Sequence, residues 1–196
     1  MKKLLFVLLV VTFGFTTYGQ KLEGYVVTNA NDTIHCKFLV QTNMINNKIF
    51  YAASVYNHVK ILTEKGEKIK YAPKDIKSFF IKNTTDGNLK FVSFKEDGFK
   101  HFYHEVVNDR LSYYRLYHTV GDFDPNSVYK EFVYKDHVFL QLGMLNTRKN
   151  LAEMIKDNKV IYDKWMDEHG YYKVKDAFNI INQYNDSYKK EPIENN

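Results

Sequence analysis

The sequence predicts an α+β protein: an antiparallel, hairpin-rich β domain followed by a short three-helix C-terminal segment. Two observations lead to this prediction. Residues 21–142 alternate between short runs rich in Val, Ile, Phe and Tyr and clusters of turn residues, with no helix-length crossover between the runs. After Gly143 the apolar residues recur at helical spacing instead. We therefore expect a β domain over residues 20–143, a helical segment over 144–188 and a disordered tail over 189–196.

The N-terminal residues 1–19 have the layout of a secretory signal peptide. Two lysines precede an apolar run over residues 4–15, and Gly19 is a small residue directly before Gln20. The run is shorter than the roughly 20 residues that a membrane-spanning helix needs. We expect cleavage before Gln20, no transmembrane segment after signal removal, and an exported protein that is periplasmic or extracellular.

The first hairpin of the mature chain is predicted at residues 24–40. A strand over residues 25–28 is followed by the turn sequence NAND and by a second strand that begins at Ile34. In this second strand, Ile34, Cys36, Phe38 and Val40 fall on one face, and His35 and Lys37 fall on the other. We therefore expect Cys36, the only cysteine, to lie in the core as an inert thiol that forms no internal disulfide.

Later strands are separated by further clusters of turn residues, at positions 64–68, 84–88, 95–99 and 107–111. The helical part then divides into three short helices, because Asn158 and Gly170 are plausible helix ends. Each helix carries one apolar stripe: Leu151, Met154 and Ile155 in the first, Ile161, Trp165 and Met166 in the second, and Val174, Phe178, Ile181 and Tyr184 in the third.

Several stretches together resemble a known family. They are a signal ending in Gln, the opening GYVVTNANDTI, the internal YAPKDIKSFFI, the strand LSYYRLY and the closing AFNIINQYN. With these, nearly all of the mature chain resembles a family of exported Bacteroidota proteins of unknown function. The resemblance implies an envelope or extracellular location and a β-rich domain with a helical C-terminus, and it implies no known activity.

One strand carries a candidate binding row. In RLSYYRLYH, Tyr113, Arg115 and Tyr117 share one face, and Tyr114, Leu116 and His118 share the other. One face has to cover the core, and the other then presents its rings either to the C-terminal helices or to a ligand. A Tyr/Arg/Tyr row suits a protein or a glycan, because rigid rings give contact area at a small entropic cost and Arg adds directional donors. Packing beneath the helices is the alternative.

A modification site is predicted at Thr33. The tripeptide Asp32-Thr33-Ile34 resembles the short O-glycosylation sequon of exported Bacteroidota proteins, and the alternation of the strand places the Thr33 hydroxyl in solvent. A plain turn accounts for Asn31 and Asp32 equally well.

The remaining constellations favour neither a metal site nor a catalytic site. His101 and His104 are three positions apart in a strand-like run, so their side chains point to opposite faces. The sequence GDFDPNSVYKE offers Asp122, Asp124 and Asn126 as oxygen ligands, but it lacks the glycine and the final glutamate of a calcium loop and reads as a turn. There is no GxSxG motif for a nucleophilic serine.

These features make a non-catalytic envelope or extracellular module that binds a protein or a glycan the leading hypothesis, with no cofactor. The whole chain has a formal net charge of +5, of which Lys2 and Lys3 in the signal contribute two, so neither charge nor location favours nucleic-acid binding. Two other function classes stay open. One is a hydrolase assembled from distant residues, and the other is a structural or assembly factor of the envelope.

Overall fold

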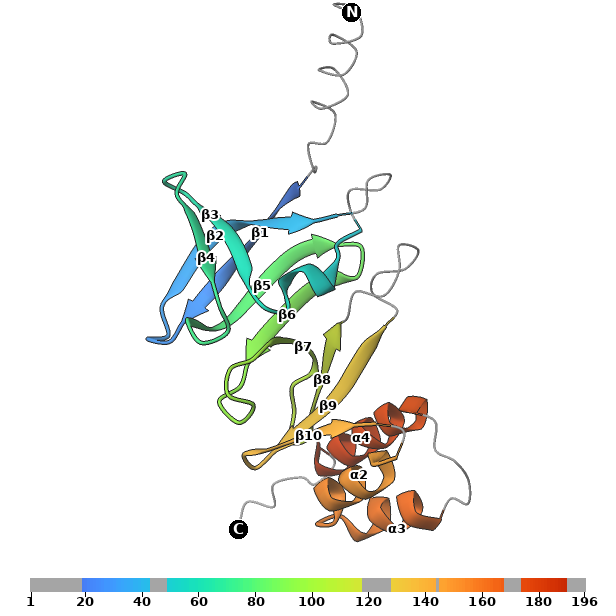
Figure 1. The fold of residues 1–196 in the computed structure, drawn as a ribbon. Helices are drawn as coiled ribbons and strands as arrows, with labels where there is room; N and C mark the ends of the chain where they lie inside the picture. The colour runs from blue at the N-terminus through green and yellow to red at the C-terminus, as the bar shows by residue number, and fades with distance from the viewer. Residues whose placement is uncertain (1–18, 43–48, 118–127, 144, 168–173, 190–196) are drawn as a thin grey trace, which may run out of the picture.

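The computed structural model describes residues 19–42, 49–117, 128–143, 145–167 and 174–189. It confirms the predicted α+β fold, with an antiparallel sheet followed by three C-terminal helices (Figure 1). The strands are β1 (Gly19–Thr28), β2 (Thr33–Gln41), β3 (Val59–Thr63), β4 (Lys68–Tyr71), β5 (Ile76–Thr84), β6 (Gly87–Ser93), β7 (Phe102–Val107), β8 (Ser112–Tyr117), β9 (Tyr129–Lys135) and β10 (Val138–Leu142). The helices are η1 (Ala52–Val55), α2 (Thr147–Ile155), α3 (Lys159–Asp167) and α4 (Val174–Lys189).

The strand order combines two meanders through one long-range pairing. The order is β10-β9-β8-β7-β6-β5-β1-β2-β3-β4, so every neighbouring pair is consecutive in sequence except β5 and β1. All pairs are antiparallel, and the β1–β5 register places Tyr25 opposite Phe80 and Gly24 opposite Ile81. The four turn clusters predicted at 64–68, 84–88, 95–99 and 107–111 each overlap a connection between consecutive strands.

The N-terminal half of the sheet is strongly curled. In a flat sheet, four strand spacings of about 4.8 Å would separate β4 from β5, or about 19 Å. The connection from Tyr71 to Ile76 reaches at most about 17 Å. The end of this connection lies beside the β1–β2 turn because Thr28 pairs with Ile76, and the Asn29 side chain donates to the Lys74 carbonyl there at 2.9 Å. One face of β1–β5 therefore becomes concave and the other convex.

The concave face encloses the first of three hydrophobic clusters. Phe38, Ile61, Phe79 and Ile81 are fully buried there, and Cys36 lies in the same cluster at 7% exposure, as the alternation of β2 predicts. Gly24 is needed at this point because β5 passes very close to β1. A Cβ atom at Gly24 would lie 1.9 Å from the Phe80 carbonyl oxygen.

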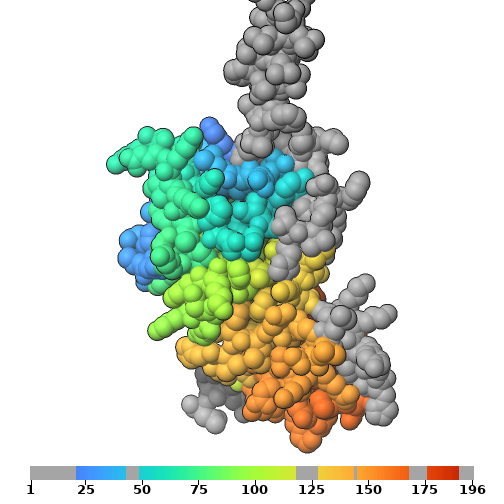
Figure 2. Space-filling model, in the orientation of Figure 1, coloured from blue at the N-terminus to red at the C-terminus, as the bar shows by residue number. Residues whose placement is uncertain are grey.

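The second cluster joins the helices to the C-terminal end of the sheet. Trp165 in α3 and Tyr184 in α4 are fully buried in it, together with Tyr113 of β8. The buried Asn185 side chain bonds to both backbone groups of Leu111: its amide donates to the Leu111 carbonyl, and its oxygen accepts from the Leu111 N–H, both at 2.9 Å. Figure 2 shows the helices at the opposite end of the molecule from β1–β4.

A carboxylate at the end of α2 supplies a second connection between the helices and the sheet. Asp157 accepts from Lys135 of β9 at 2.7 Å and from Arg110 at 3.1 Å, and the Tyr184 hydroxyl donates to it at 2.9 Å. Burial opposes ionisation of Asp157, but the hydrogen bonds from Lys135, Tyr184 and Arg110 outweigh it and lower its pKa below the usual range.

The helical boundaries refine the sequence prediction. Asn158 does separate two helices, and its side-chain oxygen accepts from the Ile161 N–H at 3.1 Å, which caps α3. Gly170 lies outside the described residues. The last helix includes Lys189, which pairs with Asp109 at 2.9 Å and was placed at the start of the predicted tail. None of the helices in the described residues is long and apolar enough to cross a membrane.

Candidate functional site

The predicted row of Tyr113, Arg115 and Tyr117 lies inside the protein. Tyr113 is fully buried and packs against Phe178 of α4, with ring centroids 5.3 Å apart. Tyr117 is 8% exposed and belongs to the first cluster, while the half-buried Arg115 stacks over the Tyr129 ring at 4.3 Å. The three residues share one face, as expected, but they span the boundary between the two clusters on that face.

The other face of β8 is covered as well. Tyr114 and Leu116 form a third cluster with Tyr103 and Phe132, and Phe94 packs on it from the β6–β7 connection. The structure therefore agrees with the alternative to a ligand-binding row: β8 is buried on both faces, and Tyr113 packs beneath the C-terminal helices. The physical reason is its central position among β7, β9, the helices and the aromatic side chains of the β6–β7 connection, which the strand pattern alone does not reveal.

Polar groups meet where the first two clusters adjoin. The Tyr113 hydroxyl donates to Glu131, and His104 Nδ1 lies 3.0 Å from the Tyr117 hydroxyl. Burial, and then the neighbouring Arg115, lower the pKa of His104 to about 4, so His104 is neutral at physiological pH. Burial also raises the pKa of Glu131, against the effects of the Tyr113 hydrogen bond and the Arg115 charge.

The two histidines predicted to diverge have separate partners. His101 precedes β7 and its Nδ1 lies 2.9 Å from the Asn57 amide oxygen, whereas His104 faces Tyr117. In the described part of the chain, no group of three or more His, Cys, Asp or Glu side chains is placed to hold a metal ion. The turn with Asp122, Asp124 and Asn126 lies outside the described residues, and so does His118.

Thr33 is the first residue of β2 and is exposed. It pairs with Val27 across the first hairpin, and the turn before it is held by the Thr28 N–H, which donates to the Asp32 carbonyl at 2.9 Å. The exposed position is the one that modification of its hydroxyl would require, and O-glycosylation of Thr33 stays a prediction.

The convex face of β1–β5 carries a dense set of lysines. The inward residues of these strands, among them Phe38, Ile61 and Ile81, are buried, and the lysines beside them point outward. We call this surface the lysine-rich face. Its lysines are Lys21 of β1, Lys37 of β2, Lys60 of β3, Lys68 and Lys70 of β4, and Lys82 of β5, all of them exposed.

The lysine-rich face holds positive charge that the fold itself does not neutralise. The salt bridges between described residues involve lysines elsewhere, such as Lys90 with Glu105 at 2.8 Å and Lys135 with Asp157. None of the six lysines of the lysine-rich face lies within 4.0 Å of a carboxylate among the described residues. Two carboxylates on this side, Glu23 and Glu64, reduce the net charge without cancelling it.

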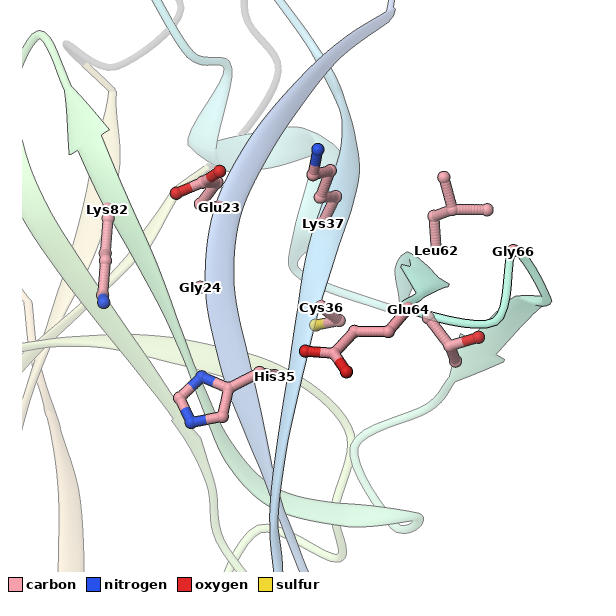
Figure 3. A pocket seen from close by; sticks show the side chains of 10 residues that line it. Glu23, Gly24, His35, Cys36, Lys37, Leu62, Glu64, Gly66 and Lys82 are labelled. Carbon is pink, nitrogen blue, oxygen red and sulfur yellow. The ribbon is translucent and has the colours of Figure 1, made fainter.

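A depression of about 580 Å³ lies in the lysine-rich face. Strands β1, β2, β3 and β5 and the β3–β4 turn contribute its lining (Figure 3). The charged groups that line it are Glu23, Lys37, Glu64 and Lys82, and the His35 ring lies with them. The strand register explains this gathering, since Glu23 lies opposite Lys37 and Lys37 lies opposite Leu62.

Aromatic rings border this depression. The half-buried Tyr25 and Phe80 stack across β1 and β5 with ring centroids 5.2 Å apart, and His35 meets the Tyr25 ring edge-on at 6.0 Å. The depression therefore has a stacked aromatic pair beside it and two lysines and two glutamates in its lining.

Cys36 also contributes to the lining of this depression, but its side chain belongs to the first cluster on the opposite face of β2 and is poorly suited to nucleophilic chemistry. Burial raises the pKa of its thiol to about 11. No hydrogen bond between described residues joins the thiol to His35, whose side chain projects to the other face of β2. A protonated, mostly buried thiol is unreactive at neutral pH.

Sequence reasoning missed the lysine-rich face, although a signal was present. Lysines occupy alternate positions in KIKY of β4, and Lys60 occupies an outward position in VKILT of β3. Because these lysines are scattered in the sequence, they resemble ordinary solvated side chains, and only the strand order brings them together.

Comparison with known proteins adds no function, because no family model, curated protein or solved structure matches the chain.

Proposed function

We propose that this chain is an exported, non-catalytic module of the envelope or the extracellular space that binds a protein or a glycan through its lysine-rich face. The observation that carries the proposal is the convex surface, whose six exposed lysines form no salt bridge with another described residue and of which Lys37 and Lys82 line a depression. The stacked rings of Tyr25 and Phe80 lie beside it. Charges of one sign gathered on one face raise the local positive potential, which attracts an anionic partner.

The proposed location rests on the N-terminal sequence. A basic start, a short apolar run and a small residue before Gln20 form a signal for export, and the resemblance to exported Bacteroidota proteins agrees with it. The mass of the secreted chain checks this: we expect a mature N-terminus at Gln20 in the periplasm or the medium, and retention of residues 1–19 in the cytoplasm would refute export.

Native pull-down from the envelope, followed by mass spectrometry and a glycan array, tests the binding function. The bait is the tagged chain, and the matched bait carries Lys37→Gln, Lys68→Gln and Lys82→Gln. We expect a defined partner or glycan that the wild-type bait retains and the variant loses. Binding of nothing by both baits would overturn the proposal. Sizing of mild detergent extracts then shows whether the complex is stoichiometric, as an assembly factor requires.

A further inference from the structure

The lysines of the lysine-rich face form a regular transverse row. Lys37 lies opposite Leu62, and Leu62 lies opposite Lys68, so these two lysines are two strands apart. Lys82 follows Ile81, which pairs with Gly24, and it lines the depression together with Glu23 and Lys37. Two strand spacings amount to about 10 Å. Across β5, β1, β2, β3 and β4 the row reads Lys82, Glu23, Lys37, Leu62 and Lys68, so a lysine recurs on every second strand and one carboxylate lies between the first two lysines. Lysines at a repeated interval match a chain that carries separated negative groups better than one compact anion.

The curvature of the surface selects a flexible ligand. Because β1–β5 curl around the first cluster, the lysines on β5, β2 and β4 point in diverging directions around a convex surface. A rigid protein partner would need a concave surface of matching shape to pack closely against the whole row. An extended flexible chain could follow the whole curve.

The kind of cation favours a polysaccharide over a protein partner. Every cation on the lysine-rich face is lysine, and the three arginines of the chain, Arg110, Arg115 and Arg148, lie outside it. Protein interfaces are enriched in Arg and depleted in Lys. Lysine is a compact point charge on a flexible stem, which suits loosely ordered anionic groups better than fixed bidentate pairing.

The aromatic pair supplies a contact for sugar rings. Tyr25 and Phe80 stack with an interplanar angle of 15°, and they lie one residue along β1 and β5 from Gly24 and Ile81, beside the depression. The C–H face of a pyranose ring is apolar and flat, and an aromatic side chain covers it well. Carboxylate or sulfate groups on the same sugar chain would then reach Lys37 and Lys82.

We propose that the lysine-rich face binds an acidic polysaccharide, a sugar chain that carries carboxylate or sulfate groups, along the row of Lys82, Lys37 and Lys68, with sugar rings against Tyr25 and Phe80. This inference rests on the proposed function and names the ligand class of the same site.

Binding of defined polymers tests the inference. The probes are polygalacturonate and dextran sulfate, with neutral dextran as the uncharged control and polyglutamate as the acidic polypeptide. The main variant is K37Q/K68Q/K82Q. The control, K100Q/K130Q/K149Q, removes the same charge from exposed lysines of the β6–β7 connection, β9 and α2. Thermal melting of every variant confirms that it is folded.

We expect at least one acidic polysaccharide to bind and neutral dextran not to bind. K37Q/K68Q/K82Q should weaken binding about tenfold and flatten its salt dependence, because exposed ionic contacts are screened by salt. The control variant should change binding less than twofold. Tyr25→Leu, which keeps an apolar contact with Phe80, should weaken the binding of the polysaccharide and leave any binding of polyglutamate unchanged.

Three results would overturn the inference. An equal loss of affinity for the acidic polysaccharide in the two triple variants would show that only the net charge of the protein attracts it. Polyglutamate binding as tight as that of the polysaccharides, with no effect of Tyr25→Leu, would show an acidic polypeptide site. Failure of both acidic polysaccharides, while the pull-down still recovers a lysine-dependent protein, would remove the inference and leave the proposed function standing.

Discussion

The contact between Asn185 and Leu111 offers a sharp test of how the helices are held on the sheet. Asn185 is 2% exposed and Leu111 is fully buried, so neither backbone group of Leu111 has access to water. Asn185→Ala removes both 2.9 Å hydrogen bonds and leaves a buried N–H and a buried carbonyl without their partner. Each such loss costs about 1 to 3 kcal/mol. Because some water enters the vacated space, we expect a decrease of about 2 to 4 kcal/mol in the free energy of unfolding.

Urea unfolding followed by Trp165 fluorescence measures this change. Trp165 is the only tryptophan and is fully buried in the cluster that joins the helices to the sheet, so its emission reports on their docking. Asn150→Ala is the matched control, because the Asn150 side chain also donates to a backbone carbonyl, that of Gln141 at 2.8 Å, but at an exposed site. We expect the control to cost less than about 1 kcal/mol.

Equal decreases in the free energy of unfolding for Asn185→Ala and Asn150→Ala would refute the reasoning. A loss below about 1 kcal/mol for Asn185→Ala would mean that water or a local shift satisfies Leu111, so burial does not set the cost. Circular dichroism identifies one further outcome. If Trp165 responds at a lower urea concentration than the β signal, the helices undock before the sheet unfolds, and the contact still stabilises the docked state.

Three other predictions concern the β domain. Gly24→Ala should destabilise the fold by about 3 kcal/mol or more, because its Cβ would lie 1.9 Å from the Phe80 carbonyl oxygen. Gly143→Ala is the control, since a Cβ there meets no atom within 4 Å. Equal melting temperatures of the two variants would contradict the close approach of β1 and β5. The Cys36 thiol, with its pKa near 11, should react with a disulfide reagent at pH 8 about 100-fold more slowly than in urea, and equal rates would show that it is accessible. Because burial and Arg115 lower the folded-state pKa of His104 to about 4, the unfolded chain takes up this proton first as the pH falls. Between pH 7 and pH 4, the free energy of unfolding of the wild type should therefore decrease by about 3 kcal/mol more than that of His104→Phe. Urea titrations at each pH measure this difference. Equal decreases in the free energy of unfolding of the two proteins would refute a neutral, buried His104.

The predictability of the fold and of the candidate site differs because they depend on different interactions. The alternation of Ile34, Cys36, Phe38 and Val40 predicted which face of β2 is buried, since side chains in a strand alternate whatever the rest of the chain does. Turn residues likewise marked the hairpins, because their backbone preferences are local. The Tyr113 to Tyr117 row was assigned to one face correctly, but its exposure depended on what packs above it, and no local pattern contains that information.

The sequence by itself determined the class of the fold, the positions of many turns and the inward position of Cys36, because each follows from periodicity or from the backbone preferences of a few adjacent residues. Only the tertiary structure decided that β5 returns to pair with β1, that the sheet curls, and that the exposed lysines of β1–β5 share one convex face. These features arise from hydrogen bonds and packing between residues tens of positions apart, such as Tyr25 and Phe80, which no local pattern specifies.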